Sequence, residues 1–171
     1  MNNTKHQNIG LFGFGTVGQG LYQVIEKAPN TKSRITKVVA RNPSKKRNLA
    51  AELVSFNTKD ILLDKTIDTV TELIDDADAA WDIVHSALKK GKNVVSGNKK
   101  MIAEHLSELL ELQKITGKSL LYDASACGSI PVIRNLEEYY DNDLLISITG
   151  ILNGSSNYIL TKMYESNLPY H

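Results

Sequence analysis

Apolar residues are grouped along this chain in two alternating patterns, short continuous runs and longer stretches with helical spacing. The short runs, which predict buried β-strands, are residues 8–14, 35–41, 66–74, 92–97 and 119–125. The stretches that predict amphipathic helices between them are residues 17–28, 42–54, 79–91 and 102–117. This alternation predicts the α/β class, with a doubly wound parallel sheet whose two faces are covered by helices.

Two of the predicted helices end at glycines. Gly91 follows Lys89 and Lys90, and Gly117 closes the helix at 102–117. Glycine adopts the left-handed conformation that ends a helix without strain, and lysines in the last turn complement the helix dipole. These residues therefore place the helix ends.

The last part of the chain has a different pattern. Residues 128–140 predict a helix, with Ser129 as a candidate N-cap and Pro131 in the first turn. Residues 143–152 alternate as expected for the first strand of a new sheet, and residues 153–166 predict another helix.

A domain needs a hydrophobic core of its own, which one strand and two helices do not easily close. We therefore expect a first domain at residues 1–128 and the incomplete start of a second, α+β domain at residues 129–171.

Composition narrows the classes of protein to which the chain can belong. Of its 171 residues, 42% are hydrophobic and 23% are charged, as in soluble globular proteins. The net charge of +1 and the lack of a basic tract argue against nucleic acid as a partner. The sequence has a polar N-terminus, a single cysteine and no apolar run that could span a membrane. It therefore predicts a cytoplasmic protein without a disulfide framework.

The segment NIGLFGFGTVGQGLYQVI contains the most informative motif, Gly13-x-Gly15-x-x-Gly18, between a predicted strand and a predicted helix. The first glycine permits a tight turn, the second lets the backbone approach a pyrophosphate, and the third lets helix and strand pack closely. Free N–H groups at the helix N-terminus then face the phosphates. In this β/α context the motif predicts a Rossmann-like dinucleotide-binding domain rather than only a tight turn.

The residues after the second predicted strand bear on the choice of dinucleotide. NAD-selective sites carry Asp or Glu about 20 residues after the glycine loop. This chain instead has Arg41, followed by Lys45, Lys46 and Arg47. A cation pairs with a 2′-phosphate, so we favour NADP over strict use of NAD. A solvated basic turn is the alternative.

Three further segments indicate a family. They are VVSGNKKMIAEH at 94–105, YDASACGSIPVIRNL at 122–136 and GILNGSSNYILTKM at 150–163. In this order, after GFGTVG, they resemble homoserine dehydrogenase. The resemblance implies NAD(P)-dependent interconversion of L-aspartate 4-semialdehyde and L-homoserine, a step of threonine, isoleucine and methionine biosynthesis. It also implies a Rossmann domain followed by a catalytic and dimerisation region, and a homodimer.

The resemblance assigns residues to the cofactor and to catalysis. The implied cofactor-binding residues are Gly13, Phe14, Gly15, Thr16, Val17, Gly18, Arg41 and Lys99. Lys99 matches a family lysine near the nicotinamide and the substrate, where an ammonium can polarise a carbonyl oxygen or handle the alcohol proton. Read without the resemblance, Lys99 and Lys100 are an ordinary charged pair at the start of a helix.

Two other sites are implied in the same way. The loop after the fifth predicted strand matches a segment that holds a monovalent cation, commonly Na⁺, with ligands that would fall on Asp123, Ala126, Gly128 and Ile130. The family usually has Glu where Asp123 stands, and a tight interdomain turn is the alternative. The residues that match the substrate pocket are Asn153, Gly154 and Ser155. Ser155 and Ser156 are also suited to capping the helix that follows.

The family's acidic substrate-binding residues and its principal acid/base lysine lie beyond the segment that ends this chain. The resemblance is therefore to a C-terminally truncated enzyme, expected to bind NADP(H) and to turn over homoserine poorly or not at all. An unfinished second sheet is expected to leave an apolar edge exposed and to promote association.

Two single features are compatible with other functions. Cys127 could attack an aldehyde as a thiolate, as in phosphorylating semialdehyde dehydrogenases, although small neighbours favour a buried, inert thiol. A non-enzymatic NAD(P)-sensing module would need a DNA- or partner-binding element, and none is evident. Trp81, His85 and His105 are interpreted as packing residues.

Overall fold

The structure is a computed structural model that describes residues 6–28, 31–128, 130–151 and 153–170. The chain divides into two compact units, Met1–Ser125 and Ala126–His171.

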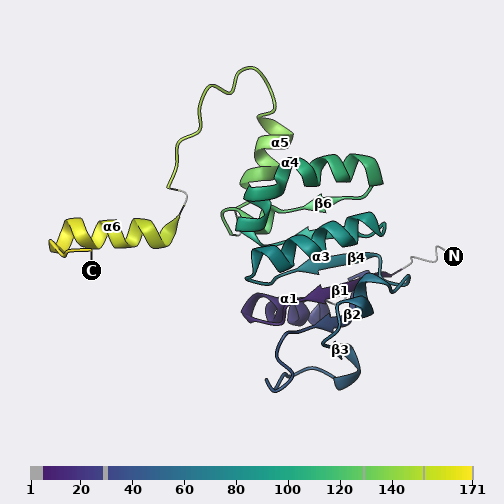
Figure 1. Ribbon diagram of the computed structural model, residues 1–171. Coiled ribbons are helices and arrows are strands. Elements are labelled where there is room, and N and C mark those ends of the chain that lie inside the picture. Colours follow the sequence, from purple (N-terminus) through teal and green to yellow (C-terminus); the bar gives the residue numbers. More distant parts are fainter. Residues whose placement is uncertain (1–5, 29–30, 129, 152, 171) are drawn as a thin grey trace. The chain divides into compact units, whose positions relative to one another are not determined.

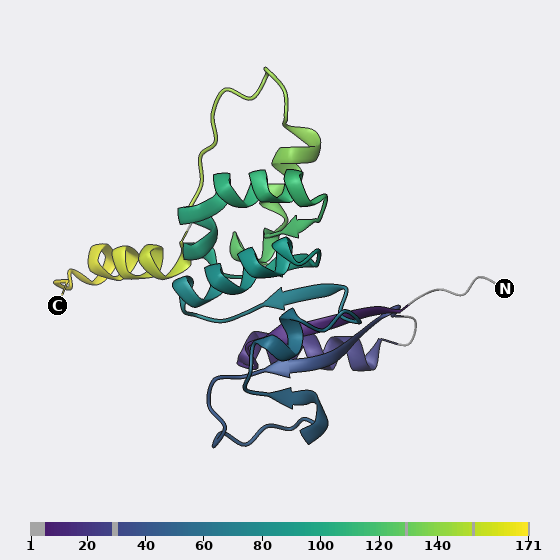
Figure 2. The ribbon, with the colours of Figure 1, turned by 45° about the vertical axis from the view of Figure 1, so that its right-hand side comes forward.

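The first unit is built on a parallel sheet of six strands. Its strands are β1 (Gln7–Phe12), β2 (Ser33–Val39), β3 (Val54–Ser55), β4 (Thr69–Glu72), β5 (Asn93–Ser96) and β6 (Leu120–Leu121). Every neighbouring pair is parallel, and the order across the sheet is β3-β2-β1-β4-β5-β6 (Figures 1 and 2). This is the doubly wound order of a dinucleotide-binding sheet, so the predicted fold class is confirmed.

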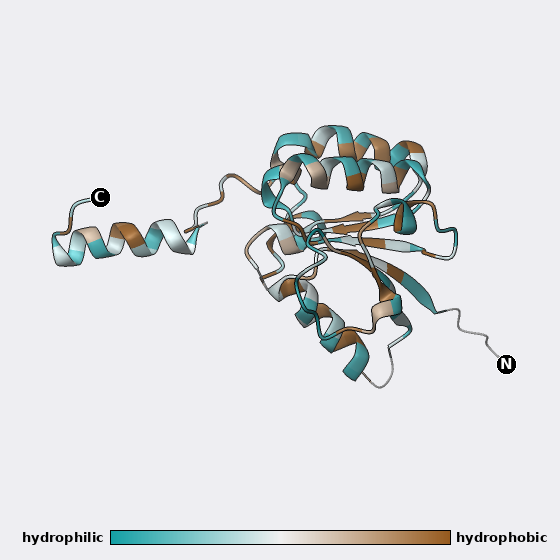
Figure 3. Cartoon of the chain, turned by 60° about the horizontal axis from the view of Figure 1, so that its bottom comes forward, coloured by the Kyte–Doolittle hydropathy of each residue, from teal (hydrophilic) through white to brown (hydrophobic). Residues whose placement is uncertain are grey.

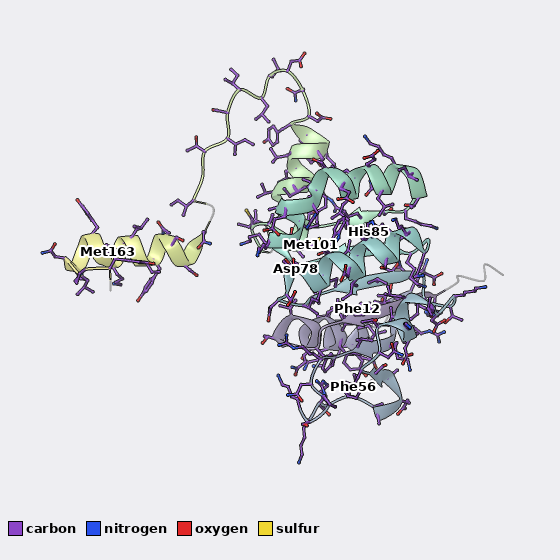
Figure 4. The ribbon with its side chains drawn as sticks, viewed as in Figure 1. Phe12, Phe56, Asp78, His85, Met101 and Met163 are labelled. Atoms are coloured by element: carbon purple, nitrogen blue, oxygen red, sulfur yellow. The ribbon has the colours of Figure 1, made fainter. Side chains whose placement is uncertain are left out.

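Helices cover both faces of this sheet (Figure 3). They are α1 (Thr16–Lys27), α2 (Lys59–Leu62), α3 (Ala77–Lys89) and α4 (Lys99–Thr116), with 3-10 turns η1 (Ala51–Leu53) and η2 (Asp123–Ser125). Successive residues of a strand point to opposite faces, and β1 illustrates the result. Leu11 belongs to a cluster against which Leu21 and Ile25 of α1 pack, whereas Phe12 packs in the cluster of α3 and α4 (Figure 4).

Local sequence explains where the long helices begin and end. The Asp76 side chain accepts a hydrogen bond from Ala79 N at 3.0 Å and caps α3. Asn98 caps α4 in the same way, accepting from Met101 N at 2.9 Å. Gly91 and Gly117 follow these helices in the left-handed conformation, with φ of 75° and 64°, so the predicted ends are confirmed.

The helix predicted at 42–54 is wrong. These residues form turns and the 3-10 turn η1, and the chain then enters β3. Neither β3 nor α2 was predicted from the sequence. The Arg47 guanidinium donates to the carbonyl oxygens of Asn42 at 2.6 Å and Lys45 at 2.8 Å, which a helix would have used. Leu49 instead packs on the core as part of an irregular segment.

The second unit contains the two predicted helices, α5 (Val132–Tyr139) and α6 (Gly154–Ser166). Pro131 is the N-cap residue of α5, and Ser129 lies outside the described residues. The predicted strand is wrong, because residues 143–151 are irregular. A strand needs a partner for its backbone hydrogen bonds, and these residues pair with no other described segment. The expected sheet edge is therefore absent from the described residues, although apolar side chains of this segment are exposed, with 95% of Ile146 and 86% of Leu144 accessible.

Among the described residues, no helix is both long enough and apolar enough to cross a membrane.

Candidate cofactor site

The three glycines of the motif lie at the corner between β1 and α1, and each has a different environment. Gly13 has φ of 91°, and a Cβ there would clash with the carbonyl group of Leu73. A Cβ on Gly18 would clash with the carbonyl oxygen of Gly13. A Cβ on Gly15 would meet no atom within 4 Å. The protein's own packing therefore requires two of the glycines, and the third borders open space.

The N-terminus of α1 differs from those of α3 and α4. Gly15 is its N-cap residue, and no side chain accepts a hydrogen bond from the first turn. Thr16 and Val17 of that turn are exposed. Phe14 is buried and packs edge-to-face on Tyr22, with ring centroids 5.9 Å apart. A ligand at this corner would meet backbone N–H groups, which suit an anion.

The basic segment after β2 is divided between one structural arginine and exposed cations. Arg47 holds the loop through its two carbonyl contacts and lies over the Phe56 ring, 5.8 Å from its centroid. Figure 4 marks Phe56 next to this loop. Arg41, Lys45 and Lys46 are exposed. Arg41 follows β2 by two residues, and the last residue of β2, Val39, pairs with Phe12 at the end of β1 and accepts a hydrogen bond from Gly13 N at 3.0 Å.

Lys99 lies at the same edge of the sheet. It is the first residue of α4 and is exposed, and Asn98 beside it is the buried N-cap residue. Because all the strands are parallel, the carboxyl end of β5 that carries Lys99 is on the edge that carries the glycine corner. This edge is where open α/β sheets bind ligands.

A buried polar cluster at this edge was missed by the sequence analysis. Glu72 ends β4 and is fully buried, as is Ser96 at the end of β5. The Ser96 hydroxyl donates to Glu72 Oε2 at 2.5 Å, and Ile74 N donates to Glu72 Oε1 at 2.7 Å. Burial raises the pKa of Glu72, and these two hydrogen bonds oppose the rise. A glutamate inside the otherwise apolar run at 66–74 was the available signal.

The residues assigned to a cation fall in both units. Asp123 begins η2, whereas Ala126, Gly128 and Ile130 belong to the second unit. In the described part of the chain, no three His, Cys, Asp or Glu side chains gather to hold a metal ion. The monovalent cation, whose ligands would be mainly carbonyl oxygens, stays a prediction.

Cys127 was expected to be buried, and that expectation is wrong. The residue is exposed, and it lies in a left-handed turn with φ of 55°, next to Gly128 with φ of 61°. By contrast, the packing role of the aromatic residues is confirmed. The Trp81 ring stacks on His105 of α4 at 4.2 Å and lies 4.7 Å from His85 of α3, which Figure 4 labels.

The residues assigned to substrate binding are at the start of α6. Asn153 is its N-cap residue, and its Oδ1 accepts from Ser156 N at 2.9 Å. Gly154 and Ser155 form the exposed first turn. Capping therefore comes from the asparagine side chain rather than from the serine hydroxyls, and the contact with substrate stays a prediction.

Comparison with known proteins matches these features to one family. The model described as "Homoserine dehydrogenase, NAD binding domain" matches residues 13–123, and the model described as "Homoserine dehydrogenase" matches residues 131–171. The glycine corner, Arg41 and Lys99 all lie in the first match, so the first unit is a nicotinamide cofactor domain.

Relatives and solved structures agree with this match. The homoserine dehydrogenase of Bacillus subtilis is 34% identical over 97% of this chain and 40% of its own length. The structure of a homoserine dehydrogenase from Thiobacillus denitrificans has a TM-score of 0.82 and 31% identity, covering 96% of this chain and 40% of that one. The structure of the S. aureus homoserine dehydrogenase at pH 8.5 has a TM-score of 0.72 and 31% identity, and the match covers 96% of this chain and 42% of that one. The chain thus spans about 40% of the length of these relatives. It belongs to the homoserine dehydrogenase family.

Proposed function

We propose that this chain is the cofactor-binding part of a homoserine dehydrogenase and that it binds NADP(H) at the glycine corner. The observation that carries the proposal is the contrast among the three glycines. Packing explains Gly13 and Gly18, but Gly15 faces open space beside uncapped backbone amides. A pyrophosphate that approaches the backbone there accounts for both features.

NADP is the proposed cofactor because of the charge at the end of β2. Arg41 is exposed next to the glycine corner, and no carboxylate occupies the position just after β2 where NAD-selective sites place one. Arg47 serves the loop, so Arg41 is the proposed partner of the 2′-phosphate. Lys45 and Lys46 add positive charge in the same loop.

The proposed reaction of the whole enzyme is the NADP-dependent interconversion of aspartate 4-semialdehyde and homoserine, in threonine, isoleucine and methionine biosynthesis. The cofactor supplies or accepts the hydride. Lys99 is proposed to face the carbonyl or alcohol oxygen of the substrate, where its ammonium would stabilise negative charge. The proposal includes a homodimer and a substrate contact at Asn153, Gly154 and Ser155.

Calorimetric titration of the purified chain with NADPH, NADH and homoserine tests this proposal. We expect NADPH to bind more tightly than NADH, because only NADPH carries the phosphate that pairs with Arg41. We expect no homoserine-dependent reduction of NADP⁺ by the 171-residue chain. If neither dinucleotide bound, the proposed cofactor site would be refuted. Rapid oxidation of homoserine by the chain would refute the proposal that it is only the cofactor-binding part of the enzyme.

A further inference from the structure

We propose that Glu72, Ser96 and Asn98 form a positioning network for the nicotinamide half of the cofactor site. The inference rests on the proposed NADP(H) site and extends it to residues that do not touch the cofactor. Its basis is a closed ring of hydrogen bonds that ties the backbone after β4 to the backbone after β5.

The ring can be followed atom by atom. The Ser96 hydroxyl donates to Glu72 Oε2 at 2.5 Å and accepts from Asn98 N at 3.2 Å. The Asn98 side-chain amide donates to Ile74 O at 3.1 Å, and Ile74 N donates back to Glu72 Oε1 at 2.7 Å. Asn98 Oδ1 also accepts from Met101 N, so the same ring sets the start of α4 and the position of Lys99.

The chemistry of Glu72 argues against a purely structural role. Its side chain is fully buried, and Asp75, the neighbouring charge that acts on it, has the same sign. Burying a carboxyl group without a cation costs free energy, and apolar residues of similar size would fill the space at lower cost. What the carboxyl group provides is two acceptor oxygens that fix Ile74 and Ser96 in one arrangement.

The strand order places this network at the nicotinamide end. In the order β3-β2-β1-β4-β5-β6, the glycine corner follows β1 and Arg41 follows β2. A dinucleotide with its pyrophosphate at the corner and its 2′-phosphate at Arg41 must extend its nicotinamide over β4 and β5. The residues there are Leu73, Ile74, Gly97 and Lys99, all of them directly attached to the ring.

Two ligands separate this role from a general effect on folding. NADPH reaches both halves of the site, whereas 2′-phospho-ADP-ribose lacks the nicotinamide and reaches only the adenosine half. In Ser96→Ala, a smaller fraction of the molecules has the segments after β4 and β5 in the arrangement that binds the nicotinamide. The apparent affinity for NADPH falls in proportion to that fraction. We expect the Kd for NADPH to rise on the order of fivefold, as for the loss of one buried hydrogen bond, and the Kd for 2′-phospho-ADP-ribose to stay unchanged.

The chain offers a closely matched control. Ser55 ends β3, is buried, donates to a carboxylate (Asp60 Oδ2, 2.6 Å) and accepts from the N–H two residues on (Asn57, 3.0 Å). Ser55→Ala makes the same chemical change far from β4 and β5 in the sheet order, so it should leave the ratio of the two Kd values unchanged. Glu72→Gln keeps an acceptor for Ile74 N and should retain most of the affinity for NADPH.

A measurement on the unchanged chain keeps the test independent of variant folding. We expect hydrogen exchange at the amides of Ile74, Gly97 and Asn98 to be slowed by NADPH and not by 2′-phospho-ADP-ribose. The inference would be overturned if Ser96→Ala lost affinity equally for both ligands or for neither. It would also be overturned if both ligands slowed hydrogen exchange at these amides equally. Either result would leave the proposed function intact. Failure of the unchanged chain to bind both ligands would instead overturn the proposed function, and the inference with it.

Discussion

Replacing Gly15 by alanine separates the demands of the cofactor from those of the fold. The added methyl group would meet no protein atom within 4 Å, and Gly15 has φ of −82°, which alanine adopts freely. Gly20 in α1 is the matched control, because it is exposed and a Cβ there also meets nothing within 4 Å. The two variants therefore add the same group to open space at the start and within the same helix.

The expected effects on stability and binding differ in size. Alanine at an N-cap costs roughly 0.5 kcal/mol relative to glycine, and the reduced freedom of the unfolded chain offsets about the same amount. Gly15→Ala should thus unfold at nearly the original temperature, whereas Gly20→Ala should stabilise the helix by about 1 kcal/mol. At the pyrophosphate, the methyl group would displace about one charge-assisted hydrogen bond, or about 2 to 3 kcal/mol, which is roughly a 30- to 150-fold rise in Kd.

Calorimetric titration with NADPH and thermal unfolding by circular dichroism measure both quantities. For Gly15→Ala we expect a large loss of affinity for NADPH with an unchanged melting temperature. For Gly20→Ala we expect an unchanged affinity with a raised melting temperature. If both variants bound NADPH with the original Kd, the pyrophosphate would not lie at this corner and the proposed function would fail.

Four other changes give further expectations. Arg41→Ala should raise the Kd for NADPH about tenfold and that for NADH less than twofold in parallel titrations, and equal effects would contradict the assignment. Arg47→Ala should free the 42–47 loop, seen as faster tryptic cleavage after Lys45 and Lys46. Gly18→Ala should destabilise the first unit by about 2 kcal/mol in urea unfolding, because the methyl group meets the Gly13 carbonyl. The raised pKa of Glu72 means that the folded chain binds its proton more tightly than the unfolded chain, so the contribution of Glu72 to stability falls as the pH rises above the ordinary glutamate value of 4.5. Glu72→Gln should remove that fall in melting temperature, and an identical pH profile would contradict it.

The position of the glycine corner between a strand and a helix could be predicted from the sequence because its signals are local. A strand run, three spaced glycines and a helix are adjacent in the chain, and each glycine's role depends mainly on backbone geometry. Helix ends at Gly91 and Gly117 were predictable for the same reason. The helix predicted at residues 42–54 was wrong because helical spacing is a weak signal when an arginine side chain competes for the backbone carbonyl oxygens.

Interactions between distant segments needed the tertiary structure. The Glu72–Ser96 hydrogen bond joins residues 24 positions apart, and only the register of β4 and β5 brings their side chains together. The exposure of Cys127 and the irregular course of residues 143–151 also depend on what lies around them.

The sequence by itself determined the fold class, the family and the glycine corner, since backbone conformation and hydrophobic period act within a few residues. Only the tertiary structure decided which polar groups are buried, which arginine is free and which glycine faces open space. The reason is that burial and hydrogen-bond pairing are set by neighbours from other strands, whose positions the local pattern does not contain.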